Sequence, residues 1–536
     1  MDVASATTLP AVDRGRASGD APAVRHIVRG GAILFVAKLT HVAAGFGLYF
    51  FLAMFFTRSL GNVAGAAAFG IWGAVMSLIN PINMMFVIGT QQAVSHFAAS
   101  RAGSPVGAFW TCAWAQIVIV AGLFAGFQIL APQIAGWRLN DAAYVPYLRL
   151  ASLIFVFYAA KSLYQGYLNG VQRFAAQSWL DIGSSVARMV LVLSAAAIGW
   201  GVTGALGGFV ASAALLAVVA AVVVRPARDA GPALRRVFAF QGKVMVMAFL
   251  ANFLMSVDIQ AVAAWSAQVP EVAQRYAGYY TAGQKLAQIP YSLIIALSAL
   301  IFPLIAREAS NPDRSVPAGI VRQGMRALLF LLVPCVAILA ATPGASMTLV
   351  FPSLARAASE AGDPASVFGA PLAYLALAYG FFSIFMMGIS IITAGGRPGI
   401  ALLIVAATLV LSDGLVIHLT RSMGPVGAAV GVALAWALGV AMIAIVLLRR
   451  YGTMVSPLSA ARILACGGAV YFVASAVPAT GMRLLILDAG LGALFIVLLL
   501  LTFELRLAEI ARVLGELPSP WSRRAGGSRE NGARRT

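Results

Sequence analysis

The stretch VTGALGGFVASAALLAVVAAVVV at residues 202–224 contains no charged side chain. A bilayer core about 30 Å thick requires about 20 apolar residues in helical conformation, so this stretch is long enough to cross a membrane once. The stretch that follows, RPARDAGPALRR at residues 225–236, is basic. Short basic segments beside apolar spans are typical of loops at the cytoplasmic face of a membrane. The two stretches together predict a transmembrane helix that ends at the cytoplasm.

The same alternation of apolar and polar stretches extends over most of the chain. Of its 536 residues, 61% are hydrophobic and only 10% are charged, and the mean hydropathy is +0.90. Soluble domains usually carry about 25% charged residues, so water is not the main solvent of this protein. We predict an all-α polytopic membrane protein of about 14 transmembrane helices, near residues 31–56, 69–94, 107–130, 145–167, 177–199, 202–224, 244–265, 279–305, 322–342, 370–394, 398–419, 425–448, 461–479 and 484–503.

The charge distribution predicts how these helices are oriented. The chain has 37 Lys and Arg residues against 18 Asp and Glu residues, a net charge of +19. With a cytoplasmic N-terminus, about 25 basic residues fall in cytoplasmic segments and about six in periplasmic loops, namely Arg58, Arg138, Arg275, Arg356, Arg421 and Arg483. We therefore expect a bacterial inner-membrane protein with both termini in the cytoplasm. Because orientation accounts for the basic residues, we expect no nucleic-acid partner.

The spacing of glycine and proline predicts that the chain contains two related halves. Gly70 and Pro81 recur as Gly278 and Pro290, at offsets of 208 and 209 residues. Further pairs, at offsets of 225 and 223 residues, are Gly170 with Gly395 and Gly204-Ala205 with Gly427-Ala428. Because each repeat holds six helices, an even number, a pseudo-two-fold axis along the membrane normal is expected to relate the halves. A chance match in a glycine-rich chain is the alternative.

This repeat divides the chain into six segments. We expect a disordered cytoplasmic tail at 1–29, a six-helix bundle at 30–224, a basic cytoplasmic linker at 225–243, a second six-helix bundle at 244–450, two extra helices at 451–505 and a basic cytoplasmic tail at 506–536. The two bundles are expected to enclose a central cavity.

Charged and polar side chains inside the predicted spans are the candidate site residues. A charged side chain at mid-bilayer costs about 2.5–3.5 kcal/mol on insertion scales, so it is expected to face protein or a hydrated cavity. One helix face of span 177–199 carries residues at i, i+3, i+4 and i+7, namely Asp181, Ser184, Ser185 and Arg188. Span 279–305 carries a second polar stripe, formed by Thr281, Gln284, Lys285 and Gln288. The aromatic rings of Tyr280 and Tyr291 flank this stripe.

From these stripes and from two further lysines we predict a substrate site of cations and polar groups: Lys38, Lys161, Arg188, Lys285, Gln284, Gln288 and Tyr280. The carboxylates Asp258 and Asp181 are candidates for coupling transport to an ion, because a desolvated carboxyl group exchanges a proton readily. Alternatives remain open. Arg188 joins helices by hydrogen bonds, Lys161 and Lys285 extend to the membrane surface, or Asp258 forms a permanent ion pair with Lys285 or another cation.

Two motifs resemble those of bacterial polysaccharide flippases. The first is Thr57-Arg58-Ser59-Leu60-Gly61 followed by Phe69-Gly70. The second extends from Asp258 through Gly278-Tyr279-Tyr280, Ala282 and Lys285-Leu286 to Phe302-Pro303, and the resemblance covers about residues 30–450. It implies the fourteen-helix polysaccharide transporter branch of the multidrug, oligosaccharidyl-lipid and polysaccharide exporter superfamily. Members of that branch carry out no enzymatic step, so we expect neither catalysis nor a cofactor.

Composition and resemblance together lead to one expected function. The protein is expected to move an undecaprenyl-pyrophosphate-linked oligosaccharide to the periplasmic leaflet by alternating access, for synthesis of O-antigen, capsule or exopolysaccharide. Its expected partners are this glycan lipid, membrane lipids and a polysaccharide polymerase with its export machinery, and we expect a monomer. The alternatives are a peptidoglycan lipid-precursor flippase, a multidrug or cation antiporter, and more remotely a membrane-embedded glycan polymerase. No Asp-x-Asp motif is present, and the three cysteines and four histidines are scattered, which predicts no metal site.

Overall fold

The computed structural model describes the backbone of residues 21–505, except for 101–103, 225–228, 230 and 310–317. Side chains are described for residues 40–505, except in those four segments and at residues 293–309 and 320. Every regular element in the described chain is helical. The longer helices are α1 (Ala21–Leu60), α2 (Asn62–Ala99), α3 (Pro105–Ile134), α4 (Val145–Gly170), α5 (Phe174–Ala197), α6 (Gly201–Val223), α7 (Leu234–Leu254), α9 (Pro270–Ala309), α10 (Ala318–Ala341), α14 (Ala370–Ala394), α15 (Pro398–Tyr451), α16 (Pro457–Ala476) and α17 (Met482–Leu501). Shorter elements are α8 (Val257–Trp265), α11 (Pro343–Val350), α12 (Pro352–Ala361), α13 (Ala365–Phe368), the π-helical turn η2 (Ala135–Leu139) and the 3₁₀ turn η3 (Ala142–Tyr144).

The predicted all-α multi-pass fold is confirmed. Twelve helices of the described chain are long and apolar enough to cross a membrane. One of these, α15, is 54 residues long and contains the two predicted spans 398–419 and 425–448, because Gly424 adopts φ 61° and ψ −141° and bends the chain between them. Helix α9 is not among the twelve, but it contains the predicted span 279–305. With α15 counted as two spans and α9 added, the helices account for the predicted fourteen.

The structure differs from the predicted helix limits in the seventh and eighth spans. Span 244–265 is two helices, because the side chains of Asn252 and Ser256 bond to the backbone oxygens of Ala248 and Asn252, at 2.8 and 3.0 Å, where the helix is interrupted. Helix α9 begins at Pro270 rather than at residue 279. Proline is well tolerated in a first helical turn, because its missing N–H group would have no intrahelical acceptor there.

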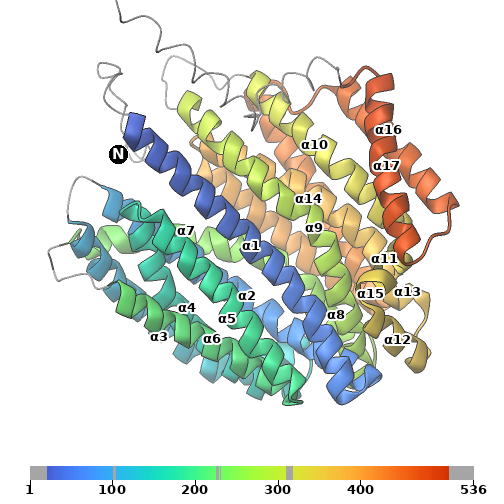
Figure 1. The fold of residues 1–536 in the computed structure, drawn as a ribbon, viewed down its shortest axis with the longest axis horizontal. Coiled ribbons are helices and arrows are strands. Elements are labelled where there is room, and N and C mark those ends of the chain that lie inside the picture. Colours follow the sequence, from blue (N-terminus) through green and yellow to red (C-terminus); the bar gives the residue numbers. More distant parts are fainter. Residues whose placement is uncertain (1–20, 101–103, 225–228, 230, 310–317, 506–536) are drawn as a thin grey trace, which may run out of the picture.

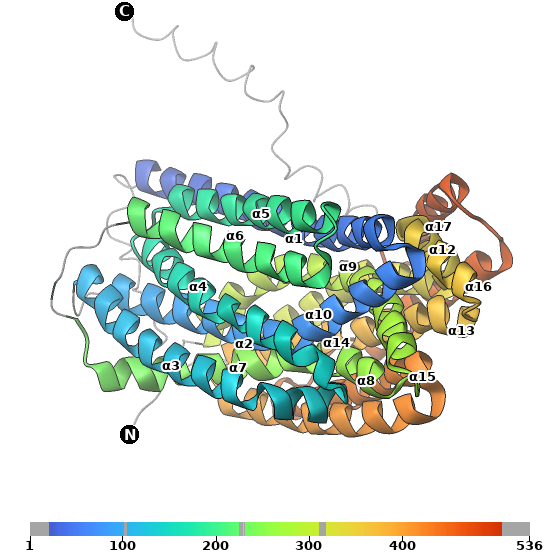
Figure 2. The ribbon, with the colours of Figure 1, turned by 90° about the horizontal axis from the view of Figure 1, so that it is seen from below.

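The helices form two bundles with the last two helices at one edge (Figure 1). In the first bundle α1 packs on α5, while α4 packs on α2, α3 and α6. In the second bundle α14 packs on α9, α10 and α15, and α16 packs on the outside of α10. The bundles meet where α2 contacts α7 and α9, which places α2 at the centre of the molecule (Figure 2). The predicted tail 506–536 and residues 1–20 of the other tail lie outside the described residues. Residues 21–29 of the predicted disordered tail and 234–243 of the predicted linker are helical instead, because they form the first turns of α1 and α7.

Two ends of the molecule are distinguished by the turns they contain. The α1–α2 end contains Gly61, η2, η3, the first turn of α9, helices α11–α13 and the bend at Gly424. The opposite α2–α3 end contains Ser100 and the turn between α14 and α15. Consecutive spans alternate between these ends, as an antiparallel bundle requires.

At the α1–α2 end the bundles cross at a pair of glycines related by the sequence repeat. A Cβ atom added to Gly70 of α2 would lie 1.7 Å from the backbone oxygen of Gln274, and one added to Gly278 of α9 would lie 2.3 Å from that of Ala66. The two helix backbones are therefore in direct contact, which only residues without a side chain allow. The glycines that the repeat pairs by sequence face each other in space, as expected for residues beside a two-fold axis.

We expect Gly70→Ala and Gly278→Ala to lower the free energy of unfolding by about 1–3 kcal/mol or more, because each added methyl group overlaps a backbone atom. Melting temperatures of the detergent-solubilised protein measure the loss. The matched controls are Gly122→Ala and Gly126→Ala in α3, where an added Cβ meets nothing within 4 Å. Equal melting temperatures for all four variants would contradict the close crossing.

Candidate functional site

A hollow lies between the two bundles at the level of the predicted polar stripes. It consists of two adjoining cavities of about 200 and 240 Å³, which share six lining residues: Tyr49, Met76, Asn80, Met84, Lys285 and Gln288. We call the two together the central cavity. Its walls come from α1, α2, α5 and α6 of the first bundle and from α7, α8 and α9 of the second. Of the predicted site residues, Arg188, Lys285, Gln284 and Gln288 line it.

Lys285 lies deep in the structure and is held by polar and aromatic contacts. Its Nζ atom donates a hydrogen bond to Oε1 of Gln288 at 3.0 Å and lies 4.5 Å from the centre of the Tyr49 ring. Gln288 in turn donates to the hydroxyl oxygen of Tyr379 at 2.7 Å. Since α9 begins at Pro270, Lys285 lies about 22 Å along the helix axis from its first residue. This distance exceeds the length of a lysine side chain, and the Nζ contacts point inward, so the alternative that Lys285 extends to the surface is not supported.

Arg188 faces the same cavity from the first bundle. Its guanidinium group lies 5.6 Å from the centre of the Phe209 ring, and both residues line the cavity. Neither Arg188 nor Lys285 forms an ion pair with a described carboxylate, and no Asp or Glu is among the described residues that line the cavity. Two cations from opposite bundles therefore face one hollow without a fixed counter-charge among the described residues.

Lys161 and Asp181 lie inside the first bundle and do not line the central cavity. The Lys161 side chain is only 4% exposed, and its Nζ donates to Oγ of Ser184 at 2.7 Å. Gln165 donates to Oδ1 of Asp181 at 2.5 Å. These residues join α4 to α5, so their contacts favour a structural role. Lys38 belongs to α1, but its side chain lies outside the described residues.

Asp258 is completely buried at the start of α8, next to the break after α7. Its carboxylate accepts hydrogen bonds from the hydroxyl group of Tyr280 at 3.0 Å and from Nε2 of Gln284 at 3.0 and 3.1 Å. It forms no ion pair with a described cation, so the alternative of a permanent pair with Lys285 is not supported. Tyr280, predicted as part of the substrate site, is only 1% exposed and donates its hydroxyl hydrogen bond to Asp258 instead.

Sequence reasoning missed Tyr49 and Tyr379 as neighbours of the site. Tyr49 lies eight residues after His41, a helical spacing that places both on one face of α1, so the pattern contained a usable signal. Tyr379 comes from α14, and its bond to Gln288 joins residues 91 positions apart. Nothing local in the sequence predicts that contact.

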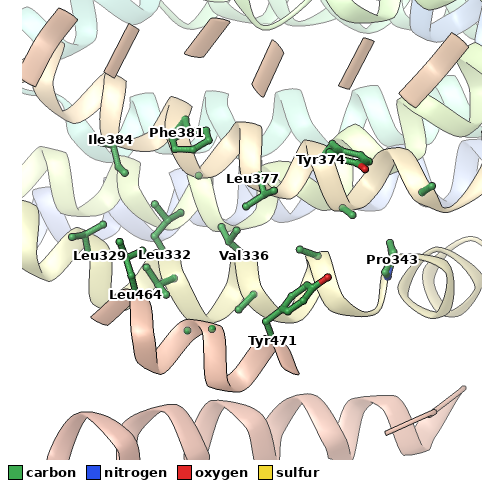
Figure 3. A pocket seen from close by; sticks show the side chains of 18 residues that line it. Leu329, Leu332, Val336, Pro343, Tyr374, Leu377, Phe381, Ile384, Leu464 and Tyr471 are labelled. Atoms are coloured by element: carbon green, nitrogen blue, oxygen red, sulfur yellow. The ribbon is translucent and has the colours of Figure 1, made fainter. Parts of the chain in front are cut away.

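A larger cavity of about 570 Å³ lies between α10, α14 and α16 (Figure 3). Its lining is apolar except for the hydroxyl groups of Tyr374 and Tyr471, with side chains such as Leu332, Leu377 and Phe381 pointing into it. No charged residue is among the described residues that line it. It suits hydrocarbon rather than an anionic group, so the central cavity remains the candidate site for a charged ligand.

Residues 64–353, more than half of the chain, match the family model described as "Polysaccharide biosynthesis protein". The chain belongs to this family. No protein in the curated set matches the sequence significantly.

Solved structures of transporters share the fold of this family member. The lipid II flippase MurJ in an inward closed conformation is 12% identical with a TM-score of 0.68, over 90% of this chain and 99% of MurJ. An inward-facing multidrug resistance transporter of the MATE family is 13% identical with a TM-score of 0.61, over 76% and 95%. A MOP superfamily transporter from Pyrococcus furiosus is 14% identical with a TM-score of 0.56, over 80% and 96%. The chain thus shares its fold with these membrane transporters.

The two buried lysines are expected to respond differently to substitution. Lys161→Ala leaves the Ser184 hydroxyl group without its buried partner and is expected to lower the unfolding free energy by about 1–3 kcal/mol. Lys285→Ala should lower the unfolding free energy by less, because water that enters the cavity is expected to replace the lost contacts. Thermal unfolding in detergent compares the two, and an equal or larger loss for Lys285→Ala would show that it is structural instead.

Proposed function

We propose that this protein moves an undecaprenyl-pyrophosphate-linked oligosaccharide from the cytoplasmic to the periplasmic leaflet of a bacterial inner membrane, for the synthesis of a surface polysaccharide. The observation that supports this most directly is the central cavity. It is lined by Arg188 from the first bundle and Lys285 from the second, and no carboxylate is among its described lining residues. A pyrophosphate carries the opposite charge. The polysaccharide biosynthesis family supports the same class of substrate.

The energetics explain why such a cavity is required. An ionised group that enters hydrocarbon loses its hydration shell. The free-energy cost is far larger than the stabilisation from a single new contact. Arginine and lysine form charge-assisted hydrogen bonds with phosphate oxygens, and these replace part of that hydration. The polar groups of Asn80, Gln284 and Gln288 provide further partners for the phosphates or sugars. The lipid chain remains in the bilayer, so only the head group needs the cavity.

The transport cycle follows from the two-bundle architecture. We propose that the bundles rock about the central cavity and expose it to one membrane side at a time. Asp258 is the candidate for coupling this motion to an ion, because its buried carboxylate joins α8 to α9 through Tyr280 and Gln284. Asp181 is a weaker candidate, since it lies within the first bundle between α4 and α5.

The other functions fit this cavity less well. A site for cationic drugs is expected to contain carboxylates, whereas the described lining here carries cations. A peptidoglycan lipid precursor presents the same pyrophosphate as a polysaccharide precursor, so the cavity alone does not separate these two substrates. The polysaccharide family favours the second.

Replacement of either cavity cation by alanine is expected to reduce polysaccharide export at least about tenfold, because each removes a charge-assisted contact to the phosphates. The assay compares Arg188→Ala and Lys285→Ala with wild type in cells that lack their own copy of the gene, by surface polysaccharide and accumulated lipid-linked glycan at equal protein level. Arg483→Ala is the matched control, since this arginine is exposed at the start of α17. Normal export by both cavity variants would remove the basis of the proposal.

The proposed orientation places the α2–α3 end in the cytoplasm. A reporter enzyme that is active only in the periplasm, fused after Thr536, should be inactive, whereas the same reporter inserted after Gly481 between α16 and α17 should be active. The reverse pattern would mean that the whole topology is inverted.

A further inference from the structure

Arg138 joins the two bundles at the α1–α2 end. It belongs to the π-helical turn η2 of the first bundle, and its two terminal nitrogens contact the two carboxylate oxygens of Asp413 on α15, at 3.2 and 2.8 Å. Its Nε atom donates to Oε1 of Gln260 on α8 at 2.8 Å. The side chains of Arg138 and Asp413 are 12% and 34% exposed. This bidentate geometry is the strongest form of an arginine–carboxylate contact.

Gln260 is held by the first bundle from both sides. Its side-chain oxygen accepts from Arg138, and its Nε2 atom donates to the backbone oxygen of Ser77 on α2 at 3.2 Å. The side chain is completely buried. A separation of the bundles at this end would therefore break the Arg138–Asp413 ion pair and both hydrogen bonds of Gln260 together.

The local backbone around Arg138 is unusual in a way that serves this contact. A π-helical turn widens the helix by one residue and is found frequently at functional sites. Here it ends at Asn140, whose φ of 53° stops the helix directly after Arg138 and Leu139. From this turn the guanidinium group extends toward the second bundle, where it also lies 5.3 Å from the centre of the Phe253 ring.

Helix α8 connects this contact to the central cavity. Asp258 and Gln260 are two residues apart on α8: Asp258 bonds to Gln284, which lines the cavity, and Gln260 bonds to Arg138. Because α8 is short and separated from α7 by the break at Met255 and Ser256, it is able to move as one unit. A shift of α9 at the cavity is thereby transmitted to Gln260.

We propose that Arg138, Asp413 and Gln260 form a clamp that keeps the two bundles closed at the α1–α2 end, and that α8 transmits the state of the central cavity to this clamp. The clamp opens when the cavity is exposed on that side. The proposal rests on the two-state cycle of the proposed function but not on the identity of the substrate, and its test measures a distance between the bundles rather than transport.

The test uses cross-linking between two cysteines across the closed end. Nδ2 of Asn62 on α2 donates to Oε1 of Glu360 on α12 at 2.5 Å, so cysteines at these exposed positions are close enough to cross-link in the closed arrangement, and opening of this end is expected to slow the reaction. Cys112, Cys335 and Cys466 are replaced by alanine in the background. The protein is reconstituted in lipid nanodiscs, and the rate of oxidative cross-linking is measured. Arg138→Ala and Asp413→Ala are expected to slow it about five- to tenfold.

The chain offers a matched control for the ion pair. Arg275 and Asp363 form a second bidentate pair at the same end, at 2.6 and 2.9 Å, but both residues belong to the second bundle. Arg275→Ala removes a bidentate arginine–carboxylate pair that does not connect the two bundles. It should therefore leave the cross-linking rate unchanged. The exchange Arg138→Asp with Asp413→Arg should restore most of the lost rate, since it rebuilds the ion pair.

Neighbouring tyrosines provide the control for α8. Tyr280→Phe removes the donor to Asp258 and should slow cross-linking about two- to threefold, whereas Tyr279→Phe, which removes a similar bond to Asp363 within the second bundle, should not. If Arg138→Ala aggregates on size-exclusion chromatography, Arg138→Lys replaces it, because lysine keeps the charge but loses the bidentate contact.

An unchanged cross-linking rate in the Arg138 and Asp413 variants, or an equal slowing by Arg275→Ala, would overturn the clamp. An equal effect of the two tyrosine variants would overturn the role of α8. Normal export by Arg188→Ala and Lys285→Ala, together with the expected slowing of cross-linking in the clamp variants, would count against the function and not the clamp.

Discussion

A charged side chain within a bilayer has to be surrounded by protein or water, and this constraint organises the interior of the molecule. The protein meets it in two ways. Lys161 is surrounded by protein between α4 and α5, where the hydroxyl oxygen of Ser184 accepts a hydrogen bond from its Nζ atom. Arg188 and Lys285 instead face a hollow between the bundles, with aromatic rings beside them and no described counter-charge. A cation of the first kind stabilises the fold, whereas a pair of the second kind is available to an anionic ligand.

The architecture keeps that hollow between two bodies rather than within one. Gly70 and Gly278 bring α2 and α9 into backbone contact at the α1–α2 end, and Arg138 bridges to Asp413 at the same end. The glycine contact brings two backbones together but carries little attraction, so it adds little resistance to separation of the bundles at this end. The arginine contact is directional and strong. The proposed clamp is therefore the contact whose loss would free the bundles at this end.

Apolar periodicity was sufficient to predict the membrane fold, because each span is a local property of about 20 residues. The same was true of the polar stripes on span 177–199 and span 279–305, which place Arg188 and Lys285 on inward faces. Sequence did not separate Lys161 from these two, because the choice depends on which neighbouring helix covers it. It also missed the break between α7 and α8 and the contact of Arg138 with Asp413, 275 positions apart. Such pairings are properties of the assembled bundles and have no local pattern.

The polar interiors of the two bundles are connected in different ways. In the first, the contacts of Lys161, Gln165 and Asp181 join α4 to α5, and the hydroxyl group of Ser185, which bonds to the backbone oxygen of Asp181, also bonds to His41 of α1 at the cavity. In the second, the contacts of Asp258 extend in one direction to Gln284 at the cavity and in the other, along α8, to Gln260. Both networks therefore reach the cavity, and the second also leads through Gln260 to Arg138 on the other side of the bundle interface. If two bundles rock as near-rigid bodies, the ligand has to influence a contact that crosses between them, and in this structure α8 provides a connected path to such a contact.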